Sequence, residues 1–345
     1  MRAVVLYEHG GPEQLVYEEH FPDPHAGPGE VVLRVQATSL NYHDVFTRRG
    51  MPGITIPLPM IPGLDLAGDI VAVGPGVEDW AVGERVLVDP VNRVEGGLMG
   101  ETMHGGLAEF CRVRMHQLVR LPDGVSYTAA AALPCAYGTA HRMMLTQGHV
   151  AAGEKILILG ASGGVGTCCV FLAKMLGAEV VACASSADKL QRLTEFGADH
   201  VINYATHDFV TEIYRLYGKP HRRGYDGGVD VVINYTGGDT WVKSFKCLRR
   251  GGRLLTCGAT ASFDPPTDMR YIWTFELHIL GSNGWTRTDL ETLLQLVQDK
   301  ALTPVIDCIL PLPEAREAVR LLEERKVIGK VIVAPSLSLR APEHC

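Results

Sequence analysis

The chain lacks several features that would place it outside the cytosol. No apolar run among its 345 residues reaches membrane-spanning length, and the opening residues, MRAVVLYEHGG, do not contain the apolar core of a signal peptide. Basic residues are not in excess, since 32 Lys and Arg stand against 39 Asp and Glu, for a net charge of −7. We therefore expect a soluble, cytoplasmic protein that binds neither nucleic acid nor a membrane.

The cysteines lack the spacing of a metal site or a disulfide framework. There are nine of them, no two form a C-x-x-C pair, and several lie inside apolar segments. An odd and dispersed set argues against paired disulfides. The sequence therefore predicts mainly reduced, buried thiols.

What the chain does contain indicates a globular protein of two domains. It is 46% hydrophobic and 21% charged, and its length exceeds what one small core needs. Residues 1–125 read as an all-β, barrel-like unit with many turns. Its clearest strands are expected at 31–35, 69–73 and 85–88.

From residue 126 onward, helical segments alternate with short strands, which predicts an α/β fold with a doubly wound parallel sheet. Six strands are expected, at 155–159, 179–183, 200–203, 230–234, 253–257 and 278–280. Amphipathic helices at 289–298 and 313–324 and a strand at 330–333 follow, and we expect this tail to complete the N-terminal domain.

The segment 155–166, KILILGASGGVG, is the most informative part of the chain. It predicts a buried strand, a glycine-rich turn and the start of a helix, which gathers backbone N–H groups at one point. A dinucleotide pyrophosphate can bind there. The residues expected to contact it are Ser162, Gly163, Gly164, Val165 and Gly166.

The end of the second strand indicates which dinucleotide is bound. An NAD site usually presents a carboxylate here, whereas this strand ends in Ala184, followed by Ser185, Ser186 and Lys189. Two hydroxyls and an ammonium group suit a 2′-phosphate, and Tyr204 adds a phenol donor. A serine that merely caps the next helix is the simpler interpretation, and it is compatible with phosphate binding. We predict NADPH as the cofactor.

With these motifs in place, the whole chain resembles the medium-chain dehydrogenase/reductase family. Residues 63–86, GLDLAGDIVAVGPGVEDWAVGERV, resemble the family signature that begins GHE and ends in G-D-x-V. The run SLNYHD at 39–44, the glycine turn, the strand that ends in TCG at 256–258 and the GSNG at 281–284 also fit. This resemblance implies a GroES-like, mainly β catalytic domain at 1–136, completed by 282–345, and a Rossmann domain at 137–281.

The chain departs from the family's zinc-dependent members at their ligand positions. It has Asn41 where they have a cysteine, Leu64 in place of the GHE histidine, and Cys135 at the third position. One soft ligand, even with Asp65 nearby, does not build a three-ligand site. The segment 88–106 also lacks the four cysteines of a structural zinc lobe. We expect no metal, and Cys135 is interpreted as a small buried hydrophobic residue.

The resemblance implies chemistry without a metal. Zinc-free members reduce C=C bonds conjugated to a carbonyl, or quinones, and the chain is similar to quinone oxidoreductases and to enoyl-CoA reductases related to crotonyl-CoA carboxylase/reductase. The second likeness rests on Ser185, Ser186 and Lys189, on DMRYIW at 268–273 and on Asn41 with Tyr42. The choice among a free enone, a quinone and a CoA thioester stays open. An alcohol dehydrogenase and a non-catalytic NADPH-binding protein are the alternatives.

Site residues also follow from the resemblance. Asn41, Tyr42 and His43 stand where zinc members keep ligand and proton-relay residues, so they are the expected catalytic groups. Asn41 and Tyr42 would donate hydrogen bonds to an enolate, and His43 would supply or relay the proton. A structural pair of His43 with Asp44 is the alternative.

The remaining expectations concern the nicotinamide end of the cofactor and the assembly. Gly258 and Ala259, with Asn283 beyond the next strand, are expected to hold the carboxamide, and Lys330 of IGKVIV to lie near the cofactor. His104 and Tyr137 are weaker candidates for the substrate site. The strand at 278–280 resembles the edge through which family members pair, so we expect a homodimer or homotetramer acting on a small-molecule substrate.

Overall fold

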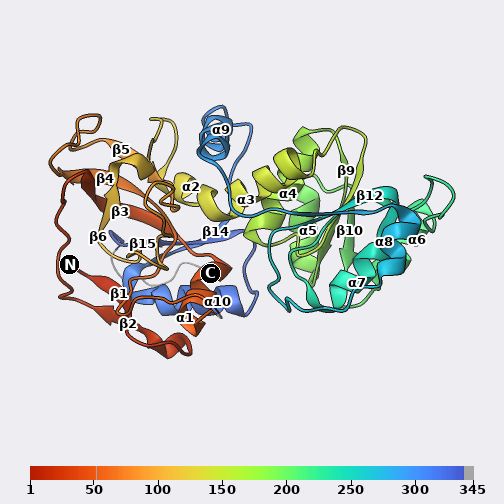
Figure 1. Ribbon diagram of the computed structural model, residues 1–345, viewed down its shortest axis with the longest axis horizontal. Coiled ribbons are helices and arrows are strands. Elements are labelled where there is room, and N and C mark those ends of the chain that lie inside the picture. The colour runs from red at the N-terminus through yellow and green to blue at the C-terminus, as the bar shows by residue number, and fades with distance from the viewer. Residues whose placement is uncertain (52, 338–345) are drawn as a thin grey trace. The chain divides into compact units, whose positions relative to one another are not determined.

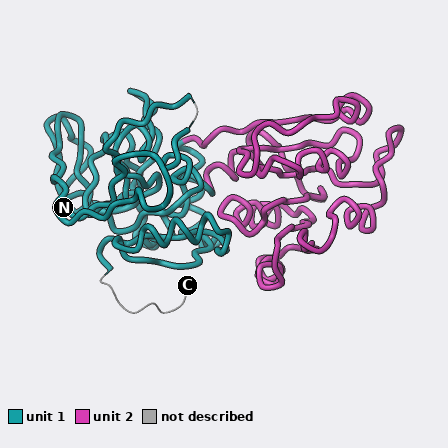
Figure 2. Tube along the Cα trace, turned by 90° about the horizontal axis from the view of Figure 1, so that it is seen from below, with its two compact units in different colours: residues 1–136, 287–345 teal, residues 137–286 magenta. Residues whose placement is uncertain are grey.

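The structure is a computed structural model that describes residues 1–51 and 53–337. The chain divides into two compact units, which are coloured separately in Figure 2. Unit 1 is residues 1–136 together with 287–345, of which 338–345 lie outside the described residues, and unit 2 is residues 137–286. The second boundary therefore falls after Thr286, beyond the expected residue 281.

Unit 1 is built on a sheet in the order β14-β15-β3-β4-β5-β7, with β6 also paired to β3 (Figure 1). All of its pairings are antiparallel except that of β14 with β15. The strands of this sheet are β3 (Glu30–Ser39), β4 (Asp65–Val73), β5 (Arg85–Val88), β6 (Phe110–Arg114), β7 (Leu118–Arg120), β14 (Ile306–Pro311) and β15 (Lys330–Ala334). A separate pair is formed by β1 (Ala3–Leu6) and β2 (Leu15–Glu18).

Helices complete unit 1, and they are α1 (Tyr42–Arg49), α2 (Tyr127–Ala131), α9 (Arg287–Gln298) and α10 (Ala315–Glu323). The core gathers apolar side chains from β1, α1, β14, α10 and β15. The tail is thus part of unit 1, as expected, and β15 pairs with β3 through Ile332 opposite Ser39. The expectation of strands alone in residues 1–125 is wrong at 42–49, which form α1.

Unit 2 contains a six-stranded parallel sheet in the order β10-β9-β8-β11-β12-β13. The strands are β8 (Lys155–Ile158), β9 (Glu179–Ala184), β10 (His200–Asn203), β11 (Val229–Ile233), β12 (Leu248–Thr256) and β13 (His278–Gly281). The chain order reverses between β8 and β11, which is the switch point where ligands bind in doubly wound sheets. The predicted parallel sheet and all six of its strands are confirmed.

The helices of unit 2 are α3 (Thr139–His141), α4 (Gly164–Met175), α5 (Ala187–Glu195), α6 (Phe209–Tyr217), α7 (Gly238–Cys247) and α8 (Met269–Phe275). Apolar residues of α6, α7 and α8 share one core with β8, β9 and β11. The cysteines Cys168, Cys169, Cys183 and Cys247 are buried in this unit. No helix in the described part of the chain is long and apolar enough to cross a membrane.

Candidate functional site

The glycine turn of unit 2 leaves a helix N-terminus open to a ligand. Gly163 is the N-cap of α4, and no side chain caps the helix there. The first N–H groups of an α-helix have no partner within the helix, so this end can hold an anion. A Cβ on Gly163 would have no neighbour closer than 3.7 Å, the carbonyl oxygen of Gly160.

Two other glycines of the turn are required by close packing. Gly160 has φ +67°, a conformation that glycine tolerates best, and its carbonyl accepts a 2.6 Å hydrogen bond from the Tyr235 hydroxyl. A Cβ on Gly166 would lie 2.5 Å from the Gly160 oxygen and 2.6 Å from the Tyr235 hydroxyl. Burial raises the pKa of Tyr235, which keeps its hydroxyl protonated as a donor.

The expected 2′-phosphate residues lie together at the same edge of the sheet. β9 ends at Ala184 and β10 at Asn203, and these two residues are paired, so Ser185 and Tyr204 emerge side by side. Tyr204 is 43% exposed. Ser186 is the N-cap of α5, with its Oγ accepting from the Lys189 N–H at 3.4 Å. Ser186 therefore caps α5. The expected 2′-phosphate residues also face outward around the N-terminus of this helix.

The nicotinamide candidates follow the last two strands of the sheet. Thr256 and Gly281 end β12 and β13 in paired register, so Gly258, Ala259 and Asn283 all lie at the carboxyl-end edge. This is the edge that carries the glycine turn. Tyr137, by contrast, is fully buried, with its hydroxyl 3.5 Å from the Thr167 Oγ1, and it belongs to the core of unit 2.

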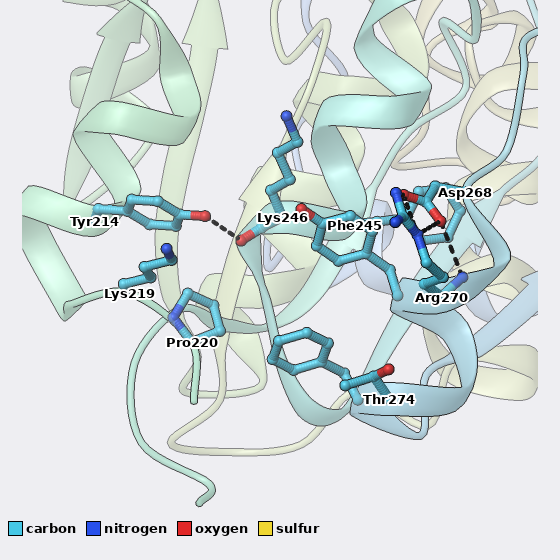
Figure 3. Close-up of a pocket in the computed structure, with 10 residues that line it drawn as sticks. Tyr214, Lys219, Pro220, Phe245, Lys246, Asp268, Arg270 and Thr274 are labelled. Atoms are coloured by element: carbon cyan, nitrogen blue, oxygen red, sulfur yellow. Dashed lines mark hydrogen bonds and ion pairs between the residues drawn. The ribbon is translucent and has the colours of Figure 1, made fainter. Parts of the chain in front are cut away.

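Unit 2 also has a cavity that sequence reasoning did not predict (Figure 3). Its volume is about 350 Å³, and the residues that line it are Tyr214, Lys219, Pro220, Phe245, Lys246, Asp268, Arg270, Tyr271, Thr274 and Phe275. It includes part of the DMRYIW segment, in which Arg270 is ion-paired with Asp268 at 2.8 Å. The carboxyl ends of α6, α7 and α8 lead into the next strands, so these helix ends lie at the amino-end edge of the sheet. The cavity lies toward this edge, opposite the glycine turn.

In unit 1, the start of α1 holds the second group of candidate residues. Asp44, the third residue of the helix, reaches back so that its Oδ2 accepts the Asn41 N–H at 2.8 Å. Its Oδ1 accepts the N–H groups of Gly63 and Leu64, each at 3.1 Å. Burial raises the pKa of Asp44, while these backbone donors oppose the shift. Asp44 thus fixes α1 against the segment that begins β4.

Asn41 is held between two charged side chains. Its Oδ1 accepts from the Lys330 Nζ at 2.5 Å, and its Nδ2 donates to Asp65 Oδ2 at 2.8 Å and to the Ser39 carbonyl at 3.2 Å. The Lys330 ammonium also donates to the Leu40 carbonyl at 2.7 Å and lies 3.9 Å from Asp65. Lys330, expected beside the cofactor, has its ammonium in this buried cluster of unit 1.

Asp65 is the buried carboxyl of this cluster. It is completely buried, and that burial raises its pKa to about 7, against the opposing effects of Lys330 and Asn41. The Cys135 N–H donates to its Oδ1 at 3.0 Å. Leu64, the preceding residue in the sequence, is also buried. Among the described residues, no three His, Cys, Asp or Glu side chains are arranged to hold a metal ion.

His43 and Tyr42 are the more accessible residues of this segment. The Tyr42 ring packs edge-on against Phe46, with ring centres 5.2 Å apart. His43 Nε2 lies 2.9 Å from Oε2 of Glu101, in the 88–106 segment, so His43 pairs with Glu101. Glu101 is a residue that neither the motifs nor the resemblance marks in the sequence. His104, nearby in sequence, is exposed, and its Nδ1 accepts the Ile61 N–H at 3.1 Å.

Comparison with known proteins covers both units. Residues 27–123 match the model of the alcohol dehydrogenase GroES-like domain, and residues 164–299 that of the zinc-binding dehydrogenase domain. The synaptic vesicle membrane protein VAT-1 homolog of Rattus norvegicus is 31% identical, over 97% of this chain and 84% of its own. Acryloyl-coenzyme A reductase of Sulfurisphaera tokodaii is 30% identical, over 97% of this chain and its full length. The crystal structure of an NAD-dependent alcohol dehydrogenase is 36% identical with a TM-score of 0.88, covering 97% and 99% of the two chains.

The packing of Gly166 makes a testable prediction about the turn. We expect Gly166→Ala to lower the free energy of unfolding by about 1–3 kcal/mol, because the new methyl group overlaps backbone and hydroxyl atoms. Gly163→Ala is the matched control and should cost less than Gly166→Ala, because its Cβ has space and the substitution loses only the preference for glycine over alanine at an N-cap, about 0.5–1 kcal/mol. Urea denaturation of both variants measures this, and equal stabilities would contradict the packing argument.

The buried carboxyl of Asp65 predicts a pH-dependent stability. Since its pKa in the folded protein is raised to about 7, the native state binds a proton that the unfolded chain releases near pH 4. The free energy of unfolding of the parent protein therefore falls as pH rises from about 4 to about 7, because the folded state disfavours the ionised form of Asp65. Relative to the parent protein, Asp65→Asn should gain up to about 1.4 kcal/mol per pH unit across this window.

Urea denaturation of Asp65→Asn and the parent protein between pH 5 and 8 checks this prediction. The comparison uses the change in stability with pH, so a pH-independent loss of stability in the variant does not affect it. The control is Asp123→Asn, because the Asp123 side chain is fully exposed. A stability difference between Asp65→Asn and the parent protein that stays constant with pH would show that Asp65 titrates alike in both states.

Proposed function

This chain belongs to the medium-chain dehydrogenase/reductase superfamily of oxidoreductases, and we propose that it is a zinc-independent, NADPH-dependent reductase of activated C=C bonds. The substrate class is an enone or an enoyl thioester, with quinones as the related alternative. The observation that carries this proposal is the Lys330–Asn41–Asp65 cluster, because Asn41, at a position where the resemblance places a zinc ligand, instead bonds to the side chains of Lys330 and Asp65. The similarity to acryloyl-coenzyme A reductase supports the same substrate class.

The residues of unit 2 fit a bound dinucleotide phosphate. The uncapped N-terminus of α4 supplies N–H groups for a pyrophosphate, and the space at Gly163 allows close approach. Ser185, Ser186, Lys189 and Tyr204 supply hydroxyl donors and a positive charge for a 2′-phosphate. Gly258, Ala259 and Asn283 provide backbone and amide groups for a carboxamide at the same sheet edge. NADPH, when bound, supplies the hydride.

The residues of unit 1 act on the substrate in this proposal. As hydride reaches the β-carbon, charge develops on the carbonyl oxygen, and preorganised hydrogen-bond donors stabilise it. Tyr42 and Asn41 provide such donors, although Asn41 would release its longer contact, to the Ser39 carbonyl, in order to donate. His43 then provides the proton that the α-carbon needs.

An alcohol dehydrogenase is the second candidate function, favoured by the similarity to the NAD-dependent alcohol dehydrogenase structure. Alcohol oxidation in zinc enzymes of this family depends on a metal that lowers the pKa of the hydroxyl group. Asn41 and Leu64 supply no thiolate or imidazole for that metal. A protein that binds NADPH without turnover is the third candidate, against which the polar groups at residues 41–43 argue.

One panel of assays separates these candidates. We expect loss of the NADPH absorbance band with acryloyl-CoA, crotonyl-CoA, a simple enone or a quinone, and no oxidation of primary alcohols with NADP⁺. The value of kcat/KM should be about 10–100-fold higher with NADPH than with NADH, as one or two charge-assisted contacts to the 2′-phosphate provide. Enzyme dialysed against EDTA should keep its activity. A preference for NADH, or activity that needs added zinc, would overturn the proposal.

The position of Asn41 makes a prediction about turnover. Asn41→Ala removes the amide that links Lys330 to Asp65, so these buried groups lose partners and the start of α1 shifts. We expect kcat to fall at least about tenfold. The KM for NADPH should stay within about twofold, since the proposed dinucleotide residues all belong to unit 2. Unchanged kcat would exclude Asn41 from the reaction.

A further inference from the structure

The contact between His43 and Glu101 is not explained by the fold alone. His43 Nε2 is buried, and none of the groups described completes a well-aligned hydrogen bond to it. The carboxylate of Glu101 lies within ion-pair distance of that nitrogen, and the side chains of His43 and Glu101 are 22% and 11% exposed. A buried polar nitrogen with an anion beside it calls for a physical reason.

The backbone places Glu101 firmly. It lies in a turn whose Glu101 and Thr102 N–H groups both donate to the Leu98 carbonyl, at 3.2 and 3.0 Å. A Cβ on Gly100 would be 2.9 Å from the Gly63 nitrogen, so the turn packs directly on the Gly63 backbone. Asp44 binds that same Gly63 from α1. The helix that carries His43 and the turn that carries Glu101 are therefore fixed to one segment.

Charged groups around the imidazole come from three elements. Glu101 faces it from the turn, and Asp44, its neighbour in α1, interacts with it electrostatically. Lys330 of β15 and His43 both oppose the raised pKa of Asp44, and the Lys330 ammonium is bonded to the Leu40 carbonyl and to Asn41. Asp44 is already occupied by three backbone N–H groups. Glu101 is thus the carboxylate in contact with the imidazole.

We propose that Glu101 is a positioning residue for proton transfer, which holds the Nε2–H of His43 so that Nδ1 is the nitrogen that passes a proton to the substrate. This inference rests on the proposed reduction of an activated C=C bond. A carboxylate that binds one imidazole nitrogen fixes the tautomer and stabilises the imidazolium, without itself taking the proton.

The step balances as follows. Hydride transfer to the β-carbon leaves an enolate, whose α-carbon takes the Nδ1 proton of the His43 imidazolium to form the saturated product. His43 becomes a neutral imidazole with hydrogen on Nε2, and Glu101 stays ionised. Solvent returns a proton to Nδ1, which the partial exposure of the His43 side chain permits.

The first experiment measures the His43–Glu101 pair without using activity. In protein labelled with 15N at histidine, NMR shows which ring nitrogen of His43 carries the hydrogen, with the signals assigned by comparison with His43→Asn. We expect the Nε2–H form in the parent protein and a loss of part of that form in Glu101→Gln, because the substitution removes the charged acceptor beside Nε2. Glu101→Asp, which keeps the charge, should restore part of that loss.

The second experiment measures kcat and KM for reduction of the best alkene. In Glu101→Gln, kcat should fall about tenfold while the KM for NADPH stays within about twofold, because less of His43 is held so that it presents Nδ1–H to the substrate. Glu95→Gln is the matched control, since that exposed glutamate of the same segment pairs with Arg114 instead, and its kcat should not change.

The outcomes separate this inference from the proposed function. An unchanged proportion of the two His43 tautomers in Glu101→Gln overturns the inference even if the enzyme reduces alkenes. A tautomer ratio that changes while kcat does not shows that the pair exists without serving proton transfer, and also overturns it. Absence of alkene or quinone reduction by the parent protein overturns the proposed function, whereas the NMR result still reports on the pair.

Discussion

The buried ammonium group of Lys330 connects the end of unit 1 to its beginning. It donates to the Leu40 carbonyl and to the Asn41 side chain, and it lies near the buried carboxyl of Asp65. Buried ionisable groups are costly unless each is hydrogen-bonded, and here Asn41 bonds to both Lys330 and Asp65. The start of α1, the first residue of β4 and the first residue of β15 are therefore held together by one polar cluster. The orientation of residues 41–44 depends on it.

Much of the fold could be predicted because its signals are local in the sequence. The six strands of the parallel sheet are short apolar runs separated by helical segments, and the glycine turn at residues 160–166 marks the switch point. The edge bearing Ser185 and Tyr204 follows from strand order alone. Helix α1 escaped prediction because only Val45 and Phe46 are strongly apolar between its first and last residues. Its start depends on a tertiary contact, that of Asp44 with the segment before β4.

The polar contacts of unit 1 were not predictable in the same way. Lys330 and Asn41 are 289 positions apart in the sequence, and Asn41 and Asp65 are 24 apart. The resemblance and the residue types pointed to Asn41, His43 and Lys330 as site residues. They do not show which of these groups are in contact. The contact of Glu101 with His43 joins a turn to a helix, and no periodic pattern marks it. The sequence shows Asn41 and Leu64 where the resemblance places zinc ligands, whereas the contacts of Asn41 with Lys330 and Asp65 needed coordinates.

The discontinuous build of unit 1 has a consequence for synthesis of the chain. Unit 2 is one continuous stretch, residues 137–286, so it can fold as soon as that stretch has left the ribosome. Unit 1 must wait for β15, whose pairing with β3 brings Lys330 to Asn41. At about 5–20 residues per second, the emerging N-terminal segment passes tens of seconds with Asp65 lacking its cation. At the end of that interval unit 2 is complete, whereas unit 1 still lacks β15.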